Sequence, residues 1–182
     1  MKLKQFLVAL CLSLSLLIIL AGCGKGLTPS VKEGKFNFSV TYEVDGEQEI
    51  VSGVFVCEFV EAVNALDGSY IEWNSYVEDS ELFNCLEENR GYLLLKTCDD
   101  GVIYLDLNLS AKYFMADPSL GNSNANTDES ISDIRPRLFM EYNATKGEEL
   151  GKWYSEDVMV LESYGVKIIS FEYDEPIENE YK

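Results

Sequence analysis

Strict alternation of apolar and polar residues at positions 36–44 is the feature that most limits the fold of this chain. Every second position carries a large apolar side chain, namely Phe36, Phe38, Val40, Tyr42 and Val44. Because successive side chains of a strand point to opposite faces, this pattern predicts a half-buried β-strand. The dipeptide Asp45-Gly46 follows directly, and it is a strong signal for a two-residue hairpin turn.

Similar apolar runs predict six further strands, at residues 50–60, 70–77, 92–97, 102–109, 138–142 and 166–173. The run at 50–60 is apolar on both faces, which favours a central place in a sheet. A second tight hairpin is predicted at Asp99-Asp100-Gly101.

Two short helices are predicted between these strands. Residues 80–89 have apolar side chains at helical spacing, with Ser80 as the N-cap. Residues 156–164 follow Ser155 as a second N-cap, and Gly165 marks the end of that helix.

Together these elements predict one α+β or mainly β domain at residues 36–182. We expect a single antiparallel-sheet, sandwich-like domain with about two short helices. The hairpins argue against a parallel sheet. Residues 120–133 are rich in Asn, Ser, Thr and Asp and predict a loop within the domain.

The start of the chain has the pattern of a secretory signal peptide. Lys2 and Lys4 precede 16 uncharged residues at positions 6–21, and small residues end that run. A membrane-spanning helix needs roughly 20 apolar residues, so the run is short for a permanent span. We therefore assign residues 1–22 to a cleaved leader.

The run ends in Leu20-Ala21-Gly22-Cys23, and these four residues resemble the lipobox of bacterial lipoproteins. The resemblance implies cleavage between Gly22 and Cys23 and a covalent diacylglyceryl lipid on the Cys23 sulfur. No other cofactor is predicted. Two acyl chains hold a protein stably at a bilayer. We expect the protein at the extracytoplasmic face of the cell membrane, with residues 23–35 as a lipidated tether.

The body of the chain carries a second resemblance. Residues 38–46 read FSVTYEVDG, residues 164–170 read YGVKIIS, and residues 173–176 read YDEP. These stretches resemble a group of uncharacterised small lipoproteins of Gram-positive bacteria. The resemblance implies the same location and a single domain, and it carries no activity and no site residues.

Acidic residues outnumber basic ones by 32 to 14, which gives a formal net charge of −18. Loss of Lys2 and Lys4 with the leader would bring it to −20. Nucleic-acid binding needs a basic stripe, and the sequence has none, so nucleic acid is excluded as a partner. The membrane is the expected partner through the lipid, and a protein or glycan partner is left open.

Three cysteines remain after the leader and Cys23, namely Cys57, Cys85 and Cys98. This odd number allows at most one disulfide, for which Cys85 and Cys98 are the better placed pair. Cys57 alternates with Phe55 and Phe59, which predicts a buried thiol.

The sequence contains no histidine, which removes the commonest general base and a common metal ligand. It also lacks a Gly-rich phosphate loop, and its cysteines lack the spacing of a zinc motif. No catalytic residue is predicted, and a non-enzymatic role is favoured.

Weak calcium candidates are Asp99 and Asp100 in the second hairpin, and Asp117 with Asp128, Glu129 and Asp133 farther along. Carboxylates are suitable calcium ligands, but neither stretch has the spacing of an EF-hand loop. A hairpin turn and solvated acids are the simpler interpretations, so no metal is predicted.

Aromatic residues around Trp73, with Tyr70 and Tyr76, could stack on a sugar. Packing in the core is the simpler interpretation, because strands favour aromatic residues.

The favoured hypothesis is a membrane-tethered extracytoplasmic domain that binds a partner or serves the cell envelope. The alternatives are a small carboxylate-dependent hydrolase acting on envelope polymers and a solute-binding lipoprotein.

Overall fold

A computed structural model of the chain describes residues 28–65, 68–118, 134–142, 153–155 and 158–182. These residues form two four-stranded antiparallel sheets and three short helices, which confirms the predicted fold class. The first sheet has, in order across it, β3 (Gly68–Val77), β2 (Glu47–Ala65), β1 (Glu33–Val44) and β8 (Val166–Tyr173). The second has β4 (Leu93–Cys98), β5 (Gly101–Asp106), β6 (Arg137–Tyr142) and β7 (Trp153–Ser155).

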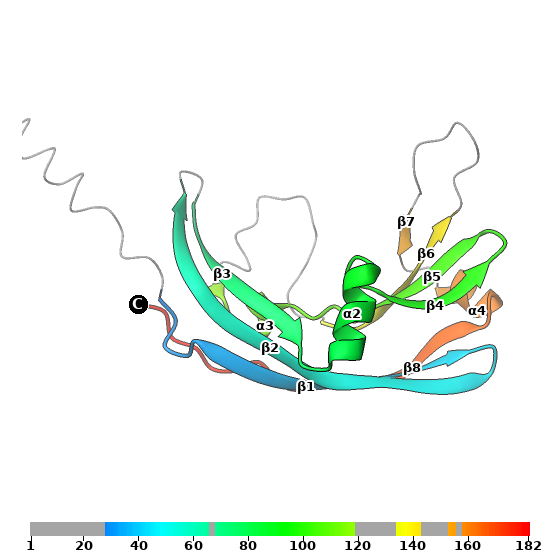
Figure 1. Ribbon diagram of the computed structural model, residues 1–182, viewed down its shortest axis with the longest axis horizontal. Helices are drawn as coiled ribbons and strands as arrows, with labels where there is room; N and C mark the ends of the chain where they lie inside the picture. The colour runs from blue at the N-terminus through cyan, green and yellow to red at the C-terminus, as the bar shows by residue number, and fades with distance from the viewer. Residues whose placement is uncertain (1–27, 66–67, 119–133, 143–152, 156–157) are drawn as a thin grey trace, which may run out of the picture.

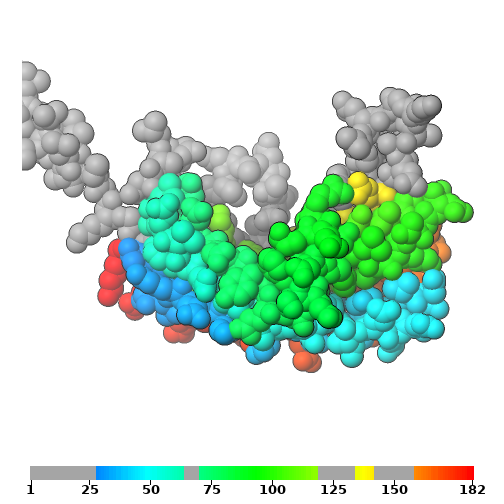
Figure 2. All heavy atoms as spheres, viewed as in Figure 1, coloured from blue at the N-terminus to red at the C-terminus, as the bar shows by residue number. Residues whose placement is uncertain are grey.

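The helices are α2 (Ser80–Glu88), α3 (Ala111–Phe114) and α4 (Val158–Ser163). Figure 1 shows the first sheet as a long curved ribbon, with the second sheet near one of its ends and α2 between the two. In the space-filling view the green side chains of the α2–β4 region lie against the cyan side chains of the first sheet (Figure 2).

Both predicted hairpins are confirmed. Val44 pairs with Glu47, and the two residues between them, Asp45 and Gly46, have φ angles of 55° and 88°. Positive φ at both central positions is the requirement of a type I′ turn, which explains the Asp-Gly dipeptide. The run predicted to be central is also confirmed as such, since β2 lies between β1 and β3.

One apolar cluster joins the two sheets. The alternating residues of β1 face it, and Phe55 and Cys57 of β2 lie on the same side. The second sheet contributes Leu105, and α3 contributes Phe114, whose ring centroid lies 4.7 Å from that of Phe36. A smaller cluster of Ile103, Met140, Leu161 and Val166 packs α4 against the second sheet and the start of β8.

The folded domain includes residues before Phe36. Pro29 forms a bridge with Tyr181, and the backbone N–H of Ser30 donates to the carbonyl of Glu180. Strand β1 begins at Glu33. Residues 28–35, which the sequence analysis assigned to the tether, are therefore held within the domain by the C-terminal tail (Figure 1).

Several local predictions need correction. Asp79, not Ser80, caps α2, because its carboxylate accepts from the backbone N–H of Leu82 at 2.8 Å. Ser155 was predicted to cap the second helix, but it is the last residue of β7 and pairs with Phe139. Strand β7 was not predicted, and α4 begins only at Val158. Helix α3 was not predicted, since four residues are too few to show a helical period.

The three cysteines of the described part are free, and Cys57 is buried as predicted. Within the same residues, no helix has the length and apolar character needed to cross a membrane. The apolar run at 6–21 lies outside the described residues.

Candidate functional site

The residues predicted to carry function fall into two groups. Gly22, Cys23, Asp128, Glu129 and Asp133 lie outside the described residues. Asp99 and Asp100 occupy the turn between β4 and β5, where the Asp100 carboxylate accepts from the Tyr164 hydroxyl at 2.8 Å. In the described part of the chain, no three acidic or cysteine side chains are grouped so that they could hold a metal ion.

Asp117, the other described calcium candidate, has a structural partner. It is the buried charged side chain of the described residues, with 3% of its surface exposed, and it accepts from the Trp73 indole nitrogen at 2.9 Å. The Trp73 ring in turn packs edge-on against Phe59, with 5.9 Å between centroids. The Trp73 ring therefore packs against Phe59 and its indole nitrogen binds Asp117, which argues against its use as a sugar-stacking platform.

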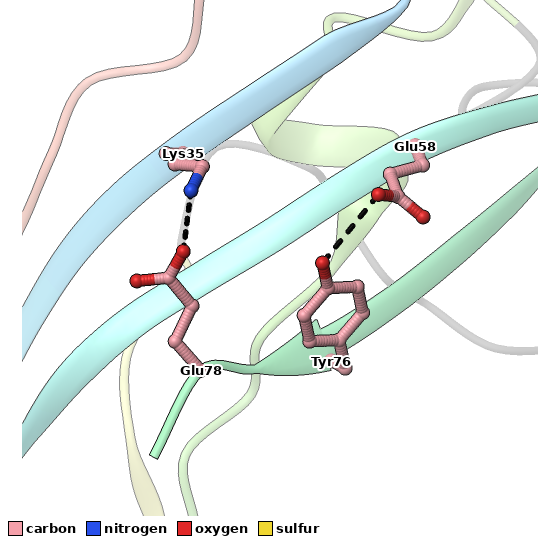
Figure 3. A network of polar contacts seen from close by, with 4 residues as sticks. All are labelled: Lys35, Glu58, Tyr76 and Glu78. Carbon is pink, nitrogen blue, oxygen red and sulfur yellow. Dashed lines mark hydrogen bonds and ion pairs between the residues drawn. The ribbon is translucent and has the colours of Figure 1, made fainter.

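A polar network lies on the face of the first sheet that is opposite the core. Figure 3 shows Lys35 of β1 paired with Glu78, and Tyr76 of β3 donating to Glu58 of β2 at 3.4 Å. The hydrogen bond and the charge of Glu78 raise the pKa of Lys35. Because these groups are largely solvated, the network has the character of a surface ion pair that covers the buried Val56 between β1 and β3.

Two clefts formed by described residues are candidate sites, and the first lies around α2. It has a volume of about 320 Å³ and lies between α2, the end of β3 and the segment after β5. Arg90 and Asn108 line it with φ angles of 61° and 51°, which are uncommon for residues other than glycine. Arg90 is paired with Glu141 at 2.8 Å, and Asn108 is held by Asp106 at 2.7 Å, so both have structural roles.

The second cleft is larger, about 610 Å³, and we call it the β8 cleft. It lies where β8 leaves β1 and the chain turns into the C-terminal tail. The residues that line it include Tyr113, Phe171 and Tyr173 and the acidic residues Glu172, Asp174 and Glu175. Because side chains alternate along β8, the side chain of Glu172 points to the face opposite Phe171 and Tyr173. The volume is within the usual range for small-molecule sites.

Hydrogen bonds fix one side of the β8 cleft. The Asp174 carboxylate accepts from the backbone N–H of Asn37 at 2.7 Å and from its side-chain amide at 2.9 Å. The Tyr173 hydroxyl donates to the carbonyl of Leu107, and burial raises the pKa of this phenol. Tyr173 therefore stays neutral, and its ring is held in place between the two sheets.

The opposite side of the β8 cleft is open. Phe171 pairs with the buried Val40 across β1 and β8, yet 44% of its surface is exposed because β8 is an edge strand. Its ring centroid lies 5.6 Å from that of Tyr173. Among the described residues, the side chains of Glu172 and Glu175 have neither an ion pair nor a hydrogen bond.

The β8 cleft was not predicted from the sequence. The alternation in 166–173 places Phe171 and Tyr173 on one face, but only the position of β8 at the sheet edge exposes that face. Tyr113 comes from α3, which had no sequence signal. In comparisons with known proteins, no family model, no curated protein and no solved structure matches the chain.

Proposed function

We propose that this protein is a lipid-anchored, extracytoplasmic binding domain, and that the β8 cleft is its binding site. The observation that carries the binding role is the cleft itself, which holds the exposed aromatic surface of Phe171. A pocket with an apolar wall and a few polar groups is the usual form of a small-molecule site.

The anchor rests on the apolar run that ends in Leu20-Ala21-Gly22-Cys23. The early start of the ordered domain adds a constraint to it. Five steps along the chain separate Cys23 from Thr28, and they span at most about 18 Å. A lipid on Cys23 would therefore keep the domain close to the bilayer surface, and the acidic body would be repelled by anionic head groups.

A binding role is favoured over hydrolysis because Asp174 has a structural role in the cleft. A carboxylate-dependent hydrolase needs two carboxyl groups on either side of a substrate, one as acid and one as base or nucleophile. Asp174 accepts two hydrogen bonds from Asn37 and thereby holds the turn after β8. The two other acids of the cleft are exposed to solvent, which suits recognition of a ligand more than proton transfer in a dry site.

The anchor is tested by labelling with radioactive palmitate and by cell fractionation, with wild type beside Cys23→Ala. We expect the wild type to carry label and to sediment with membranes, and we expect Cys23→Ala to carry none. Cys11→Ala is the matched control, because Cys11 is the other cysteine of the leader region and should not affect labelling. Label that persists in Cys23→Ala, or that depends on Cys11, would overturn the proposal.

A further inference from the structure

Strand β8 has an edge to which a further strand can be added. Among the described strands β8 has one neighbour, β1, and it lies at the end of the first sheet. Residues 169–172 are all exposed, and they include the apolar side chains of Ile169 and Phe171. Backbone groups along the edge of a sheet pair readily with an extended strand of another chain, which is a common mode of protein association.

The two charged side chains of β8 lie on the same face of the sheet. Lys167 is opposite Glu43 of β1 in the register and forms an ion pair with it at 2.9 Å. Glu172 is opposite Ser39 of β1. Both of these β1 residues alternate with the buried ones and so lie on the face away from the core. Lys167 and Glu172 therefore share this outer face, near opposite ends of β8.

A bulge brings two apolar residues of β8 to the other face. The register between β1 and β8 shifts between Thr41 and Tyr42, which leaves Ile169 as the extra residue of β8. Ile168 and Phe171 are each opposite a buried residue of β1, so both lie on the core side of the sheet. Without the bulge, residues three positions apart would point to opposite faces. Residues that are opposite each other in an antiparallel pair must share a face, and the bulge allows Ile168 and Phe171 to do so.

We infer that two copies of this protein pair through β8, antiparallel and centred on the peptide bond between Ile169 and Ser170. In this register Lys167 of each copy lies opposite Glu172 of the other, and Ile168 lies opposite Phe171. Opposite charges and apolar side chains that face each other across strands stabilise a sheet. The arrangement has two-fold symmetry, so each of these contacts occurs twice.

This pairing supplies a wall of the β8 cleft that one chain lacks. Phe171 lies at the open side of the cleft, and the second β8 places its own Ile168 beside that ring on the core side of the sheet. The inference rests on the proposed function and adds a partner at the same site, namely a second copy of the chain. The net charge of −18 opposes association, whereas anchoring in one membrane raises the effective concentration of the chains.

The register is tested by disulfide cross-linking of the full chain in cell membranes. The variant Lys167→Cys/Glu172→Cys should form a covalent dimer on oxidation, because opposite Cα atoms in an antiparallel pair lie about 4.5–5.5 Å apart, within the reach of a disulfide. A disulfide within one chain is excluded, since five steps along a strand span about 16 Å. Cys85→Ser and Cys98→Ser are present in every variant to remove the half-buried native thiols. Non-reducing electrophoresis measures the dimer.

The single variants Lys167→Cys and Glu172→Cys are the matched controls. In the proposed register the two copies of either residue lie about 16 Å or more apart, so neither variant should cross-link. Equal amounts of dimer from a single and the double variant would indicate random collision in the membrane and overturn the inference. A lysine and a bulge on an edge strand can also serve to prevent pairing. No dimer from a double variant with an unchanged circular dichroism spectrum would favour that role and equally overturn the inference.

Exchange of the charges gives a second test, by sedimentation of the full chain purified in detergent from the cells that process it. Lys167→Glu or Glu172→Lys alone should weaken association by about 10-fold or more, because two attractive pairs become repulsive. The double exchange Lys167→Glu/Glu172→Lys should restore it to within about threefold of wild type. Glu43 loses its partner in Lys167→Glu, but a lysine at position 172 does not replace that contact, so recovery reports on the pairing between chains.

A wild type that sediments as a monomer at every concentration, or a double exchange without recovery, would overturn the inference. Failure of the anchor would be seen separately, because palmitate labelling does not depend on β8. Loss of cross-linking in a protein that still carries label would remove the pairing and leave the anchor in place. Association in detergent by a protein that carries no label would do the reverse.

Discussion

Thr28 and Lys182 exchange a pair of backbone hydrogen bonds, with 3.0 Å from the Thr28 nitrogen to the Lys182 oxygen and 3.1 Å in the reverse direction. The two ends of the described chain are thus paired as in an antiparallel ladder. If the protein carries its anchor on Cys23, any force on the lipid is transmitted first to this pairing. In that case the C-terminal tail would be part of the attachment of the domain to its anchor.

Asn179 should contribute most to this pairing. Its side-chain oxygen accepts from the Ser30 hydroxyl and the Val31 backbone N–H, both at 3.0 Å, and its amide donates to the carbonyls of Val31 and Met115. We expect Asn179→Ala to lower the free energy of unfolding by about 1–3 kcal/mol. Urea denaturation measures it, with the exposed neighbour Glu178→Ala as the control. Equal stability of the two variants would show that the tail is only loosely attached.

Gly165 should resist substitution for two separate reasons. Its φ is 77°, and a Cβ atom there would lie 2.7 Å from a carboxylate oxygen of Asp45. Gly91 has a φ of 92° with nothing within 4 Å of a Cβ atom, so Gly91→Ala measures the backbone strain alone. We expect Gly91→Ala to cost about 1 kcal/mol and Gly165→Ala clearly more. Thermal unfolding of both variants tests this, and equal costs would contradict the close approach to Asp45.

The Cys57 thiol should be unreactive in the folded protein. It has no exposed surface, and burial raises its pKa from 9.0 to about 12. At pH 8, iodoacetamide should therefore modify the half-buried Cys85 and Cys98 well before Cys57, because the thiolate is the reactive form. Peptide mass spectrometry measures the order, and early modification of Cys57 would show that its strand opens readily.

The same pKa shift gives a pH dependence with a definite sign. Since the folded pKa of Cys57 lies above its unfolded value, the neutral thiol is favoured by folding. Its contribution to stability is complete below about pH 9 and is lost as the pH rises from 9 towards 12. Cys57→Ala should flatten the fall in stability over that window, relative to wild type. Parallel curves for the two proteins in urea denaturation at each pH would contradict this.

Trp73 and Asp117 should be energetically coupled in the stability of the fold. Trp73→Phe keeps the ring packing but removes the donor to a carboxylate that is only 3% exposed. We expect it to cost about 1–3 kcal/mol, because a buried carboxyl group loses a hydrogen-bond donor. A double-mutant cycle with Asp117→Asn in denaturant isolates the pair. A coupling energy near zero would show that Asp117 depends on its other contacts.

The sequence by itself was sufficient for the features that arise from neighbouring residues. Period-two alternation predicted β1, and Asp45-Gly46 predicted its turn, because a type I′ turn requires residues that tolerate positive φ. The apolar character of residues 50–60 on both faces predicted the central place of β2. These are local requirements of the backbone, so they can be read from short stretches.

Only the tertiary structure decided which strand ends lie at an edge and which segments far apart in the sequence meet. Phe171 belongs to an alternating strand like any other, and it is exposed because β8 has a neighbour on one side only. Tyr113 reaches the same cleft from a helix of four residues, and residues 28–30 are ordered by a tail from the other end of the chain. Such contacts depend on the order of strands in the sheet and on the pairing of segments far apart in the sequence. The periodicity of one segment alone does not encode them.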